Sequence, residues 1–424
     1  MKKQLLTALL VGTAVAGNAQ AVNDTVVLGA GYANQVWYSL ANDEQGSSAK
    51  DNWDIGFDVV NIMSSLHINT HGGAKLWNYP KGDKTVFGAA LDTNGLGTWS
   101  ERFNSPTSWE AGAMGAYVNP NDPFDVDWGI YDINTHIISG DSVYIIKLVN
   151  GDFKQLFIEK LASGTFHFKF ADLDGSNVVA EQVSKSSFTD KSLGYYSIVD
   201  KKTVNREPNI DKWELSFMQY GDLSGTTMMR VTGVLHNRDR NIQVAQTAAL
   251  ADAATNVNWQ AQTFQPDINT IGYDWKTFDL NTMKYTTNDS VVYFLSIEKE
   301  NVGHDIWKLR FTNFASADGS FAFSKQKLQT ASVKDINGGI TSLALYPNPV
   351  NGGDVHVAYN VPAGSKDLAL TVTDITGKVV LAQQLDNNSG LHTYTIPSNT
   401  LRSGMYIVSV SSVGGRVQQK LVIN

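Results

Sequence analysis

The chain has 424 residues, of which 42% are hydrophobic and only 17% are charged, and its formal net charge is −8. This is the composition of a globular protein, and the length suits about two or three domains. The absence of cysteine excludes disulfides, thiolate metal sites and cysteine nucleophiles. The sequence has no run of Lys and Arg, which argues against nucleic-acid binding through a basic patch.

The first 21 residues have the three parts of a secretory signal peptide. Lys2 and Lys3 give a cationic start, residues 5–16 are apolar, and Ala19-Gln20-Ala21 fits a cleavage site. No other stretch approaches the roughly 20 continuous apolar residues that a membrane helix needs. We therefore expect a signal peptide over residues 1–21 and an exported chain with no membrane span.

Most of the remaining chain has the pattern of short β-strands. Residues 142–148 and 290–296, for example, are rich in β-branched and aromatic side chains and are bounded by Gly, Asn or Asp. The exception is the alanine-rich stretch over residues 241–255, whose high helix propensity predicts a helical insertion.

The β-rich part contains an internal repeat. Residues 127–136 (DWGIYDINTH) align without a gap with residues 274–283 (DWKTFDLNTM), and residues 53–57 (WDIGF) are similar to 213–217 (WELSF). The repeat predicts two consecutive β units, over residues 22–205 and 206–330, with loops of variable length between matching strands.

A third unit, over residues 342–424, follows a polar segment at 331–341 that suits a linker. Its size and alternating strands fit a small immunoglobulin-like β-sandwich. Four ordered motifs in it resemble the type A sorting domain of type IX secretion, and they are Leu345-Tyr346-Pro347-Asn348-Pro349, Asp374-Ile375-Thr376-Gly377-Lys378-Val379, Gly404-Met405-Tyr406-Ile407-Val408 and Lys420-Leu421-Val422-Ile423-Asn424. The resemblance implies passage across the outer membrane by the type IX machinery, followed by surface attachment or release. The sorting-motif residues that it gives are Tyr346, Pro347, Asn348, Pro349, Gly404, Tyr406 and Lys420.

The two β units resemble the HmuY-like haem-binding (haemophore) family. The resemblance rests on the Trp-Asp strand at residues 53–57, on the Thr70-His71-Gly72-Gly73 turn and on later strand pairs joined by Gly turns. It implies extracellular capture of haem or a related tetrapyrrole, with axial ligands from His or Met on loops at one end of the β structure. We therefore expect an all-β chain of two tandem HmuY-like antiparallel units and a sorting sandwich, with haem as the cofactor.

Haem chemistry narrows the candidate ligands, since two axial donors must face each other ~4 Å apart across the iron in an apolar slot. His67 and His71 would be ~13 Å apart on one strand, so they can pair only if the chain turns at His71. His136 and its repeat partner Met283 form a second candidate pair. Met228, Met229 and His236 could supply mixed ligands. His167 faces the opposite way from Phe166 and Phe168, so we expect it to be exposed or to bridge a strand pair.

Two other functions remain open. A surface adhesin or carbohydrate-binding protein could use aromatic platforms, and the best set in the sequence is Trp77, Tyr79, Trp99 and Trp109. A secreted glycoside hydrolase would need two carboxylates, for which Asp54 and Asp58 are a candidate pair. The sequence lacks the common metalloprotease, α/β-hydrolase and nucleotide-binding motifs, so we expect a non-enzymatic binding protein for a small ligand, haem or a glycan.

Overall fold

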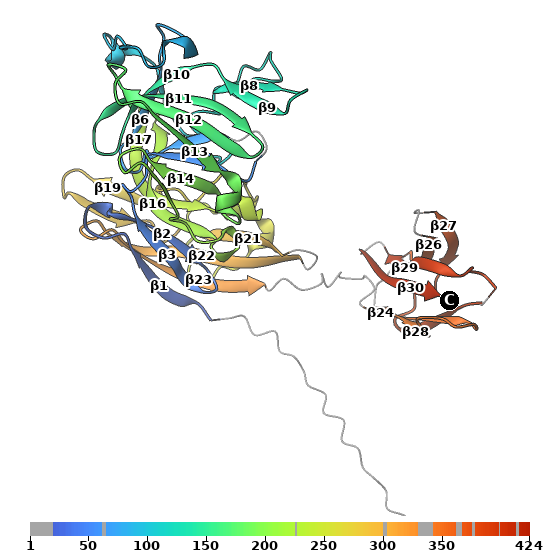
Figure 1. Ribbon diagram of the computed structural model, residues 1–424. Helices are drawn as coiled ribbons and strands as arrows, with labels where there is room; N and C mark the ends of the chain where they lie inside the picture. Colours follow the sequence, from blue (N-terminus) through green and yellow to red (C-terminus); the bar gives the residue numbers. More distant parts are fainter. Residues whose placement is uncertain are drawn as a thin grey trace, which may run out of the picture. The chain divides into compact units, whose positions relative to one another are not determined.

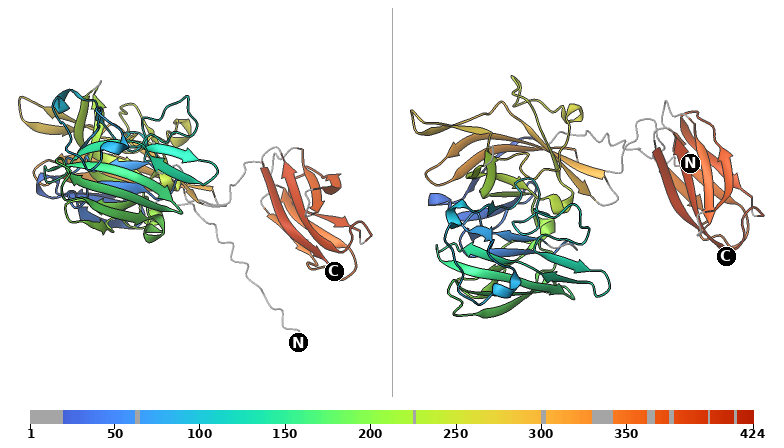
Figure 2. Two further views of the ribbon diagram at one scale, coloured as in Figure 1. Left: turned by 45° about the horizontal axis from the view of Figure 1, so that its top comes forward. Right: turned by 90° about the horizontal axis from the view of Figure 1, so that it is seen from above.

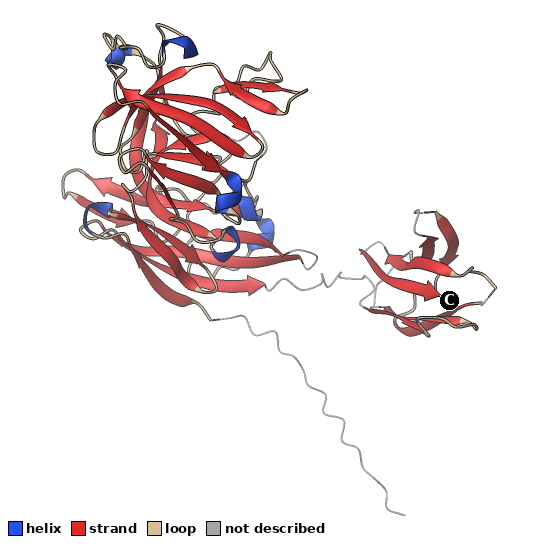
Figure 3. Cartoon of the chain, in the orientation of Figure 1, coloured by secondary structure: helices blue, strands red, loops and turns tan. Residues whose placement is uncertain are grey.

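The computed structural model describes residues 20–61, 65–224, 227–299, 303–329, 342–361, 367–374, 378–397, 399–412 and 415–424. Within these ranges the regular elements are strands and short 3-10 helices (Figure 3), which confirms the expected all-β class. The chain divides near residue 330 into two compact units, which we call the body and the C-terminal domain. Most of the expected signal peptide and the whole expected linker lie outside the described residues. The 3-10 helices are η1 (Ala30–Tyr32), η2 (Lys84–Val86), η3 (Leu96–Thr98), η4 (Lys185–Phe188), η5 (Ile210–Lys212), η6 (Arg238–Arg240) and η7 (Trp259–Ala261).

The middle of the body folds into two facing sheets, which we call sandwich A. Its strands are β4 (Ile55–Asp58), β5 (Leu66–Ile68), β6 (Lys75–Asn78), β7 (Glu101–Arg102), β8 (Gly129–Asp132), β9 (Ile137–Gly140), β10 (Val143–Lys147), β11 (Phe153–Ala162), β12 (Thr165–Asp172), β13 (Val179–Ser184), β14 (Leu193–Ser197) and β15 (Lys202–Val204). One sheet has the order β15-β14-β4-β5, and the other has the order β13-β12-β11-β10-β6-β7, with the β8–β9 hairpin attached to β11. Alternate residues of β12, namely Phe166, Phe168 and Phe170, enter the core between the sheets, because successive side chains of a strand point to opposite faces.

The other strands of the body form a second pair of sheets, which we call sandwich B. Its strands are β1 (Val22–Val27), β2 (Asn34–Ser39), β3 (Asp43–Ala49), β16 (Leu215–Ser224), β17 (Thr227–His236), β18 (Gln243–Gln246), β21 (Tyr293–Lys299), β22 (Gly303–Ala315) and β23 (Ser320–Gln329), with a separate hairpin of β19 (Lys276–Asp279) and β20 (Lys284–Thr287). The sheet orders are β3-β2-β16-β17 and β1-β23-β22-β21-β18. The core again holds alternate phenylalanines, Phe321 and Phe323 of β23.

Sandwiches A and B have the same strand order, so the repeat in the sequence extends over a whole sandwich. The sheet β15-β14-β4-β5 corresponds to β3-β2-β16-β17, and β13-β12-β11-β10-β6 corresponds to β1-β23-β22-β21-β18. The repeated segments 127–136 and 274–283 form the matching hairpins β8–β9 and β19–β20. Trp128 and Trp275, which precede these hairpins, are 0% and 1% exposed, so the repeated tryptophans are core residues.

Sandwich B is completed by strands from the N-terminus of the chain. β1 pairs antiparallel with β23, with Val22 opposite Lys325, and the blue strands lie beside the orange ones in Figures 1 and 2. β1 to β3 thus take the places that β13 to β15 hold in sandwich A. The sheets therefore do not follow the expected boundaries of 22–205 and 206–330, because β16 and β23 would each have an unpaired edge without β1 to β3.

The expected helix at residues 241–255 was a wrong prediction. This segment forms β18 and the turns that follow it. Val244 and Ala245 are fully buried, opposite Leu295 and Phe294 of β21. The edge of a sheet in sandwich B takes up this segment, so burial overrides the intrinsic helix propensity of alanine.

The C-terminal domain is a small β-sandwich, as expected. Its strands are β24 (Ser342–Tyr346), β25 (Val355–Val361), β26 (Ala369–Asp374), β27 (Val379–Gln384), β28 (Gly390–Ile396), β29 (Gly404–Ser412) and β30 (Gly415–Ile423). The sheets β24-β25-β28 and β27-β26-β29-β30 enclose one apolar core.

The first sorting motif fastens the last strand of this domain. The Asn348 side chain, between Pro347 and Pro349, donates from Nδ2 to the carbonyl oxygen of Lys420 at 2.7 Å. Its Oδ1 accepts the backbone N–H of Val422 at 3.0 Å. The amide thus binds two backbone groups of β30 and links the first sorting motif to the last strand.

The later sorting motif contains a similar tie. Tyr406, near the start of β29 at Gly404, donates its hydroxyl to the carbonyl oxygen of Arg402 at 2.9 Å. This bond from a tyrosine to upstream backbone is similar to the tyrosine corner of immunoglobulin-like sandwiches. Tyr346, by contrast, is 49% exposed and remains available for contact.

Candidate functional site

A largely apolar cavity lies where sandwiches A and B meet inside the body. Its volume is about 60 Å³. The aromatic side chains in its wall come from both sandwiches and from the loop after β7, and they are Trp37, Trp53, Trp109, Tyr195, Trp213 and Tyr220. A second, open groove of about 540 Å³ shares Thr70 and Gly221 with this wall, so the two spaces adjoin. We call them the inner cavity and the outer groove.

Several buried polar atoms in the wall of the inner cavity have no protein partner. They are Trp53 Nε1, His71 Nδ1, Ser192 Oγ, Trp213 Nε1 and Tyr220 OH. A buried polar atom without a hydrogen bond costs ~1–3 kcal/mol, so such atoms are uncommon and rarely gather by chance. Five of the twelve such atoms in the described residues belong to the wall of this cavity, which makes it the candidate site for an occupant that forms hydrogen bonds.

His71 is held as a neutral hydrogen-bond donor. Its Nε2 accepts the backbone N–H of Gln219 at 3.2 Å, so the ring proton is on Nδ1, the unpartnered nitrogen. Burial and the neighbouring cations Arg206, Lys50 and Arg230 hold the pKa of His71 well below its usual range. His71 therefore stays uncharged at neutral pH.

The turn that carries His71 is fixed by Asn69. The Asn69 Oδ1 accepts the backbone N–H of Gly72 at 2.7 Å. A Cβ atom at Gly72 would lie only 2.7 Å from Asn69 Nδ2 and from Val149 Cγ1, so this turn requires glycine. This is the chain turn on which a pairing of His67 with His71 depended.

His67 lies in the same wall, but its ring forms a hydrogen bond that stabilises the fold. Its Nε2 donates to the carbonyl oxygen of Trp109 at 2.8 Å, and Trp109 Nε1 donates to the carbonyl oxygen of His236 at 3.1 Å. This chain of contacts joins β5 of sandwich A to β17 of sandwich B through Trp109. Burial lowers the pKa of His67, which keeps the ring neutral.

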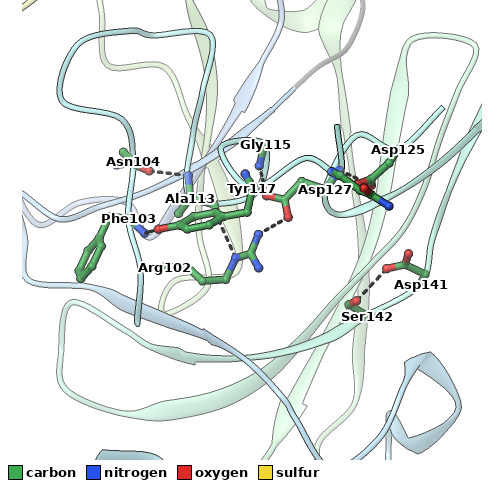
Figure 4. A network of polar contacts seen from close by, with 11 residues as sticks. Arg102, Phe103, Asn104, Ala113, Gly115, Tyr117, Asp125, Asp127, Asp141 and Ser142 are labelled. Carbon is green, nitrogen blue, oxygen red and sulfur yellow. Dashed lines mark hydrogen bonds and ion pairs between the residues drawn. The ribbon is translucent and has the colours of Figure 1, made fainter. Parts of the chain in front are cut away.

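The loop that supplies Trp109 is anchored by a polar network (Figure 4). Arg102 forms a buried ion pair with Asp127 and donates from Nε to the carbonyl oxygen of Ala113 at 3.0 Å. Asp127 also accepts the backbone N–H of Gly115 at 2.6 Å. The Arg102 guanidinium stacks over the Tyr117 ring at 4.4 Å. Because these bonds tie the two ends of the loop together, Trp109 is held in the cavity wall by a fixed support.

Glu207 and Arg206 are residues of this site that the sequence did not single out. Glu207 lies in the wall of the inner cavity, where it accepts the Tyr195 hydroxyl at 2.8 Å and the backbone N–H of Ser192. The Arg206 guanidinium stacks on Tyr195 at 5.1 Å and on Trp53 at 5.5 Å. An adjacent Arg and Glu outside the repeated segments form no motif that would predict a binding site. Their position in the site is therefore known only from the fold.

The buried Glu207 predicts a pH-dependent stability. Burial raises its pKa from 4.5 to about 7, so the folded body binds this proton more tightly than the unfolded chain does. The resulting stabilisation is complete below about pH 4.5 and is lost as the pH rises to about 7. Urea unfolding at several pH values should show this fall in the natural chain and a smaller fall in Glu207→Gln. The exposed Asp200→Asn is the control, and identical pH profiles for the natural chain and Glu207→Gln would contradict the assignment.

His136 and Met283, the second candidate ligand pair, occupy equivalent turns of two different hairpins. Their φ angles of 57° and 55° place both in the left-handed region. Met283 is 68% exposed, and the His136 Nδ1 lies 2.7 Å from the Tyr131 hydroxyl. Neither residue lines the inner cavity or the outer groove, so their match in the sequence reflects the repeated turn.

The described residues do not fit a haem as they stand. An apolar cavity of about 150 Å³ can hold benzene. The inner cavity, at about 60 Å³, is smaller than that and far too small for a haem. The Nε2 atoms of His67 and His71 already form hydrogen bonds. Met228 and His236 are eight residues apart on β17, about 27 Å along a strand, and cannot ligate one iron. Haem capture stays a prediction that rests on the resemblance.

The aromatic residues proposed as a sugar platform divide into two groups. Trp77, Tyr79 and Trp99 pack in one apolar cluster, where the rings of Tyr79 and Trp99 are 5.9 Å apart. Trp109 lies in the wall of the inner cavity. A platform of all four is therefore not formed.

The two carboxylates considered for hydrolysis both bind backbone. Asp54 is 0% exposed and accepts the N–H groups of Val149 at 3.1 Å and Ile198 at 2.7 Å. Asp58 accepts the N–H groups of Val60 at 2.9 Å and Asn61 at 3.0 Å. Both carboxylates therefore stabilise the backbone, and the spacing of Asp54 and Asp58 is explained by this structural role.

Comparison with known proteins identifies the C-terminal domain. Residues 344–424 match the family model of the secretion system C-terminal sorting domain. This match confirms the predicted sorting domain, the interaction with the type IX secretion machinery that it implies, and export to the cell surface or the extracellular space. No curated protein matches the chain. Among the described residues, no helix is long and apolar enough to cross a membrane.

Three solved structures are similar to the chain at low sequence identity. Latent dimeric PorU from Porphyromonas gingivalis has 10% identity and a TM-score of 0.18, with 85% of this chain and 31% of that chain covered. PorZ, a surface component of the type IX secretion system of the same organism, has 11% identity and a TM-score of 0.15, with 72% and 41% covered. The BSP domain of a biofilm-associated protein has 10% identity and a TM-score of 0.19, with 100% and 84% covered. The chain spans less than half of the first two, and similarities this low carry no argument about function.

Proposed function

We propose that the chain is a non-enzymatic binding protein of the cell surface or the extracellular space, and that it binds a small hydroxylated molecule between sandwiches A and B. The observation that carries this proposal is the group of unpartnered polar atoms around the inner cavity. Export through the C-terminal domain places such a site outside the cell, where a binding protein meets free ligands.

The wall chemistry favours a sugar. Three of the unpartnered atoms, on Trp53, Trp213 and His71, are N–H donors, which hydroxyl oxygens of a ligand can satisfy. Indole rings also offer flat apolar faces for the CH-rich face of a sugar ring. The inner cavity takes only part of such a ring, and the adjoining outer groove provides room for the rest.

Tryptophan fluorescence titrations with a panel of mono- and oligosaccharides test the proposal. Trp213→Phe keeps an aromatic ring in the wall but removes the N–H donor and part of the stacking face, so we expect the affinity to fall by about tenfold or more. Trp99→Phe is the matched control, because Trp99 packs in a different cluster. If no sugar binds, or if both variants bind like the natural chain, the proposal is wrong.

Haem capture is the alternative proposal, supported by the HmuY-like resemblance and by two histidines in one cavity wall. It requires sandwiches A and B to move apart and His71 to release Gln219. A saturable shift of the Soret band on addition of ferric haem, lost in His71→Ala, would support it. A featureless titration would exclude it.

A further inference from the structure

The outer groove differs from the inner cavity in its charge. Its wall contains Arg230, Lys75 and Glu101 beside the apolar side chains of Phe103 and Met228. Lys75 is paired with Glu101 at 2.9 Å, so these two charges offset each other. Arg230 is exposed, and in the described part of the chain it forms no ion pair; its Nη1 lies 3.5 Å from the carbonyl oxygen of His71.

Positive charge is concentrated where the groove meets the cavity. Lys50 donates to two neutral acceptors, the carbonyl oxygen of Gly31 at 2.7 Å and Gln219 Oε1 at 3.2 Å. Lys50 and Arg230 both act electrostatically on His71, as described above. The neighbouring Asp51 offsets the charge of Lys50, whereas Arg230 has no ion-pair partner among the described residues. A charge of the opposite sign to Arg230 is therefore expected from the ligand.

From this juxtaposition of unpartnered donors, aromatic walls and the unpaired guanidinium of Arg230, we infer that the ligand is an acidic sugar, a hydroxylated ring that bears a carboxylate. The inference rests on the proposed function. The hydroxylated part of the ring lies against Trp53 and Trp213 at the inner cavity, and the carboxylate lies in the outer groove. There the planar guanidinium of Arg230 can bind both carboxylate oxygens at once.

The experiment compares matched ligands on the full chain by calorimetric titration. The probes are glucuronate and galacturonate oligosaccharides, neutral glucose and galactose oligosaccharides of equal length, and sulfated counterparts. We expect the uronates to bind about tenfold more tightly than the neutral sugars at low salt, and to lose this preference as salt is added. Arg230→Gln should remove the preference by weakening the binding of the uronates about tenfold. Arg310→Gln is the control, because Arg310 interacts with Asp289 away from the site.

The possible outcomes separate this inference from the proposed function. Equal binding of neutral and acidic sugars, weakened in both cases by Trp213→Phe, would overturn the acidic ligand and leave the sugar site standing. Tighter binding of the sulfated sugars than of the uronates would overturn the carboxylate. Failure of every probe to bind would overturn both.

Discussion

Deletion of residues 22–49 is expected to unfold sandwich B while sandwich A keeps its sheets. The deletion removes β1 to β3, and with them five fully buried side chains of the core, namely Val26, Leu28, Val36, Tyr38 and Leu40. At about 1.5–3 kcal/mol for each buried side chain, the loss is about 7–15 kcal/mol, which equals the whole stability of an ordinary domain. Hydrogen exchange should show residues 206–329 unprotected and residues 55–204 still protected.

A circular permutant provides the matched control for this deletion. In sandwich A, a loop of residues 173–178 connects β12 to β13. In the permutant, residues 22–49 follow residue 329 and are joined to it by the same loop. The loop then connects β23 to β1 in the equivalent way, since Val22 lies opposite Lys325. This permutant should recover the protection of residues 206–329. If the deleted chain keeps sandwich B folded, β1 to β3 are not the strands that complete it.

Replacement of Asp54 by alanine should lower the free energy of unfolding by about 3–5 kcal/mol. The fully buried carboxylate accepts three backbone N–H groups, from Val149, Ile198 and Val199. Alanine leaves these donors buried without partners, at ~1–3 kcal/mol each. The midpoint of urea unfolding, with an unchanged slope, measures the effect.

The second sandwich offers a counterpart for the same test. Glu214 occupies the repeat position of Asp54 and accepts the backbone N–H of Leu40 at 2.8 Å, and it also forms an ion pair with Arg240. Glu214→Ala should therefore be strongly destabilising too. The exposed Asp200→Ala should change stability by less than ~0.5 kcal/mol. A loss below about 1 kcal/mol in Asp54→Ala would show that these N–H groups find other partners.

The sequence predicted the features that local patterns encode. Runs of β-branched and aromatic residues at 142–148 and 290–296 predicted strands, and the repeated segments 127–136 and 274–283 predicted two related units. The pairing of β1 with β23 left no such trace, because it depends on residues at opposite ends of the body. The alanines near Ala245 misled the prediction, because sheet burial is decided by tertiary contacts and not by intrinsic propensity.

The residues of the candidate site also divide into those that local sequence patterns indicate and those that only the fold brings together. The turn at His71, on which a pairing of His67 with His71 as axial ligands would depend, is present, and both residues lie in one wall. The partners of that wall, Trp37, Trp213 and Tyr220, come from sandwich B and meet it only after the two sandwiches pack. A sequence pattern within one unit cannot predict a cavity that forms between two units. The wall residues could therefore be identified only from the fold.

The closure of sandwich B by the N-terminus also imposes an order in time. Val22 and its partner Lys325 are about 300 residues apart in the chain. At a synthesis rate of ~5–20 residues per second, β1 waits on the order of 15–60 seconds for β23 to be made. Throughout that interval sandwich B lacks the strand that pairs with β1, so it cannot close. The N-terminal strands of the body therefore remain unpaired at this edge until its final strand has been made.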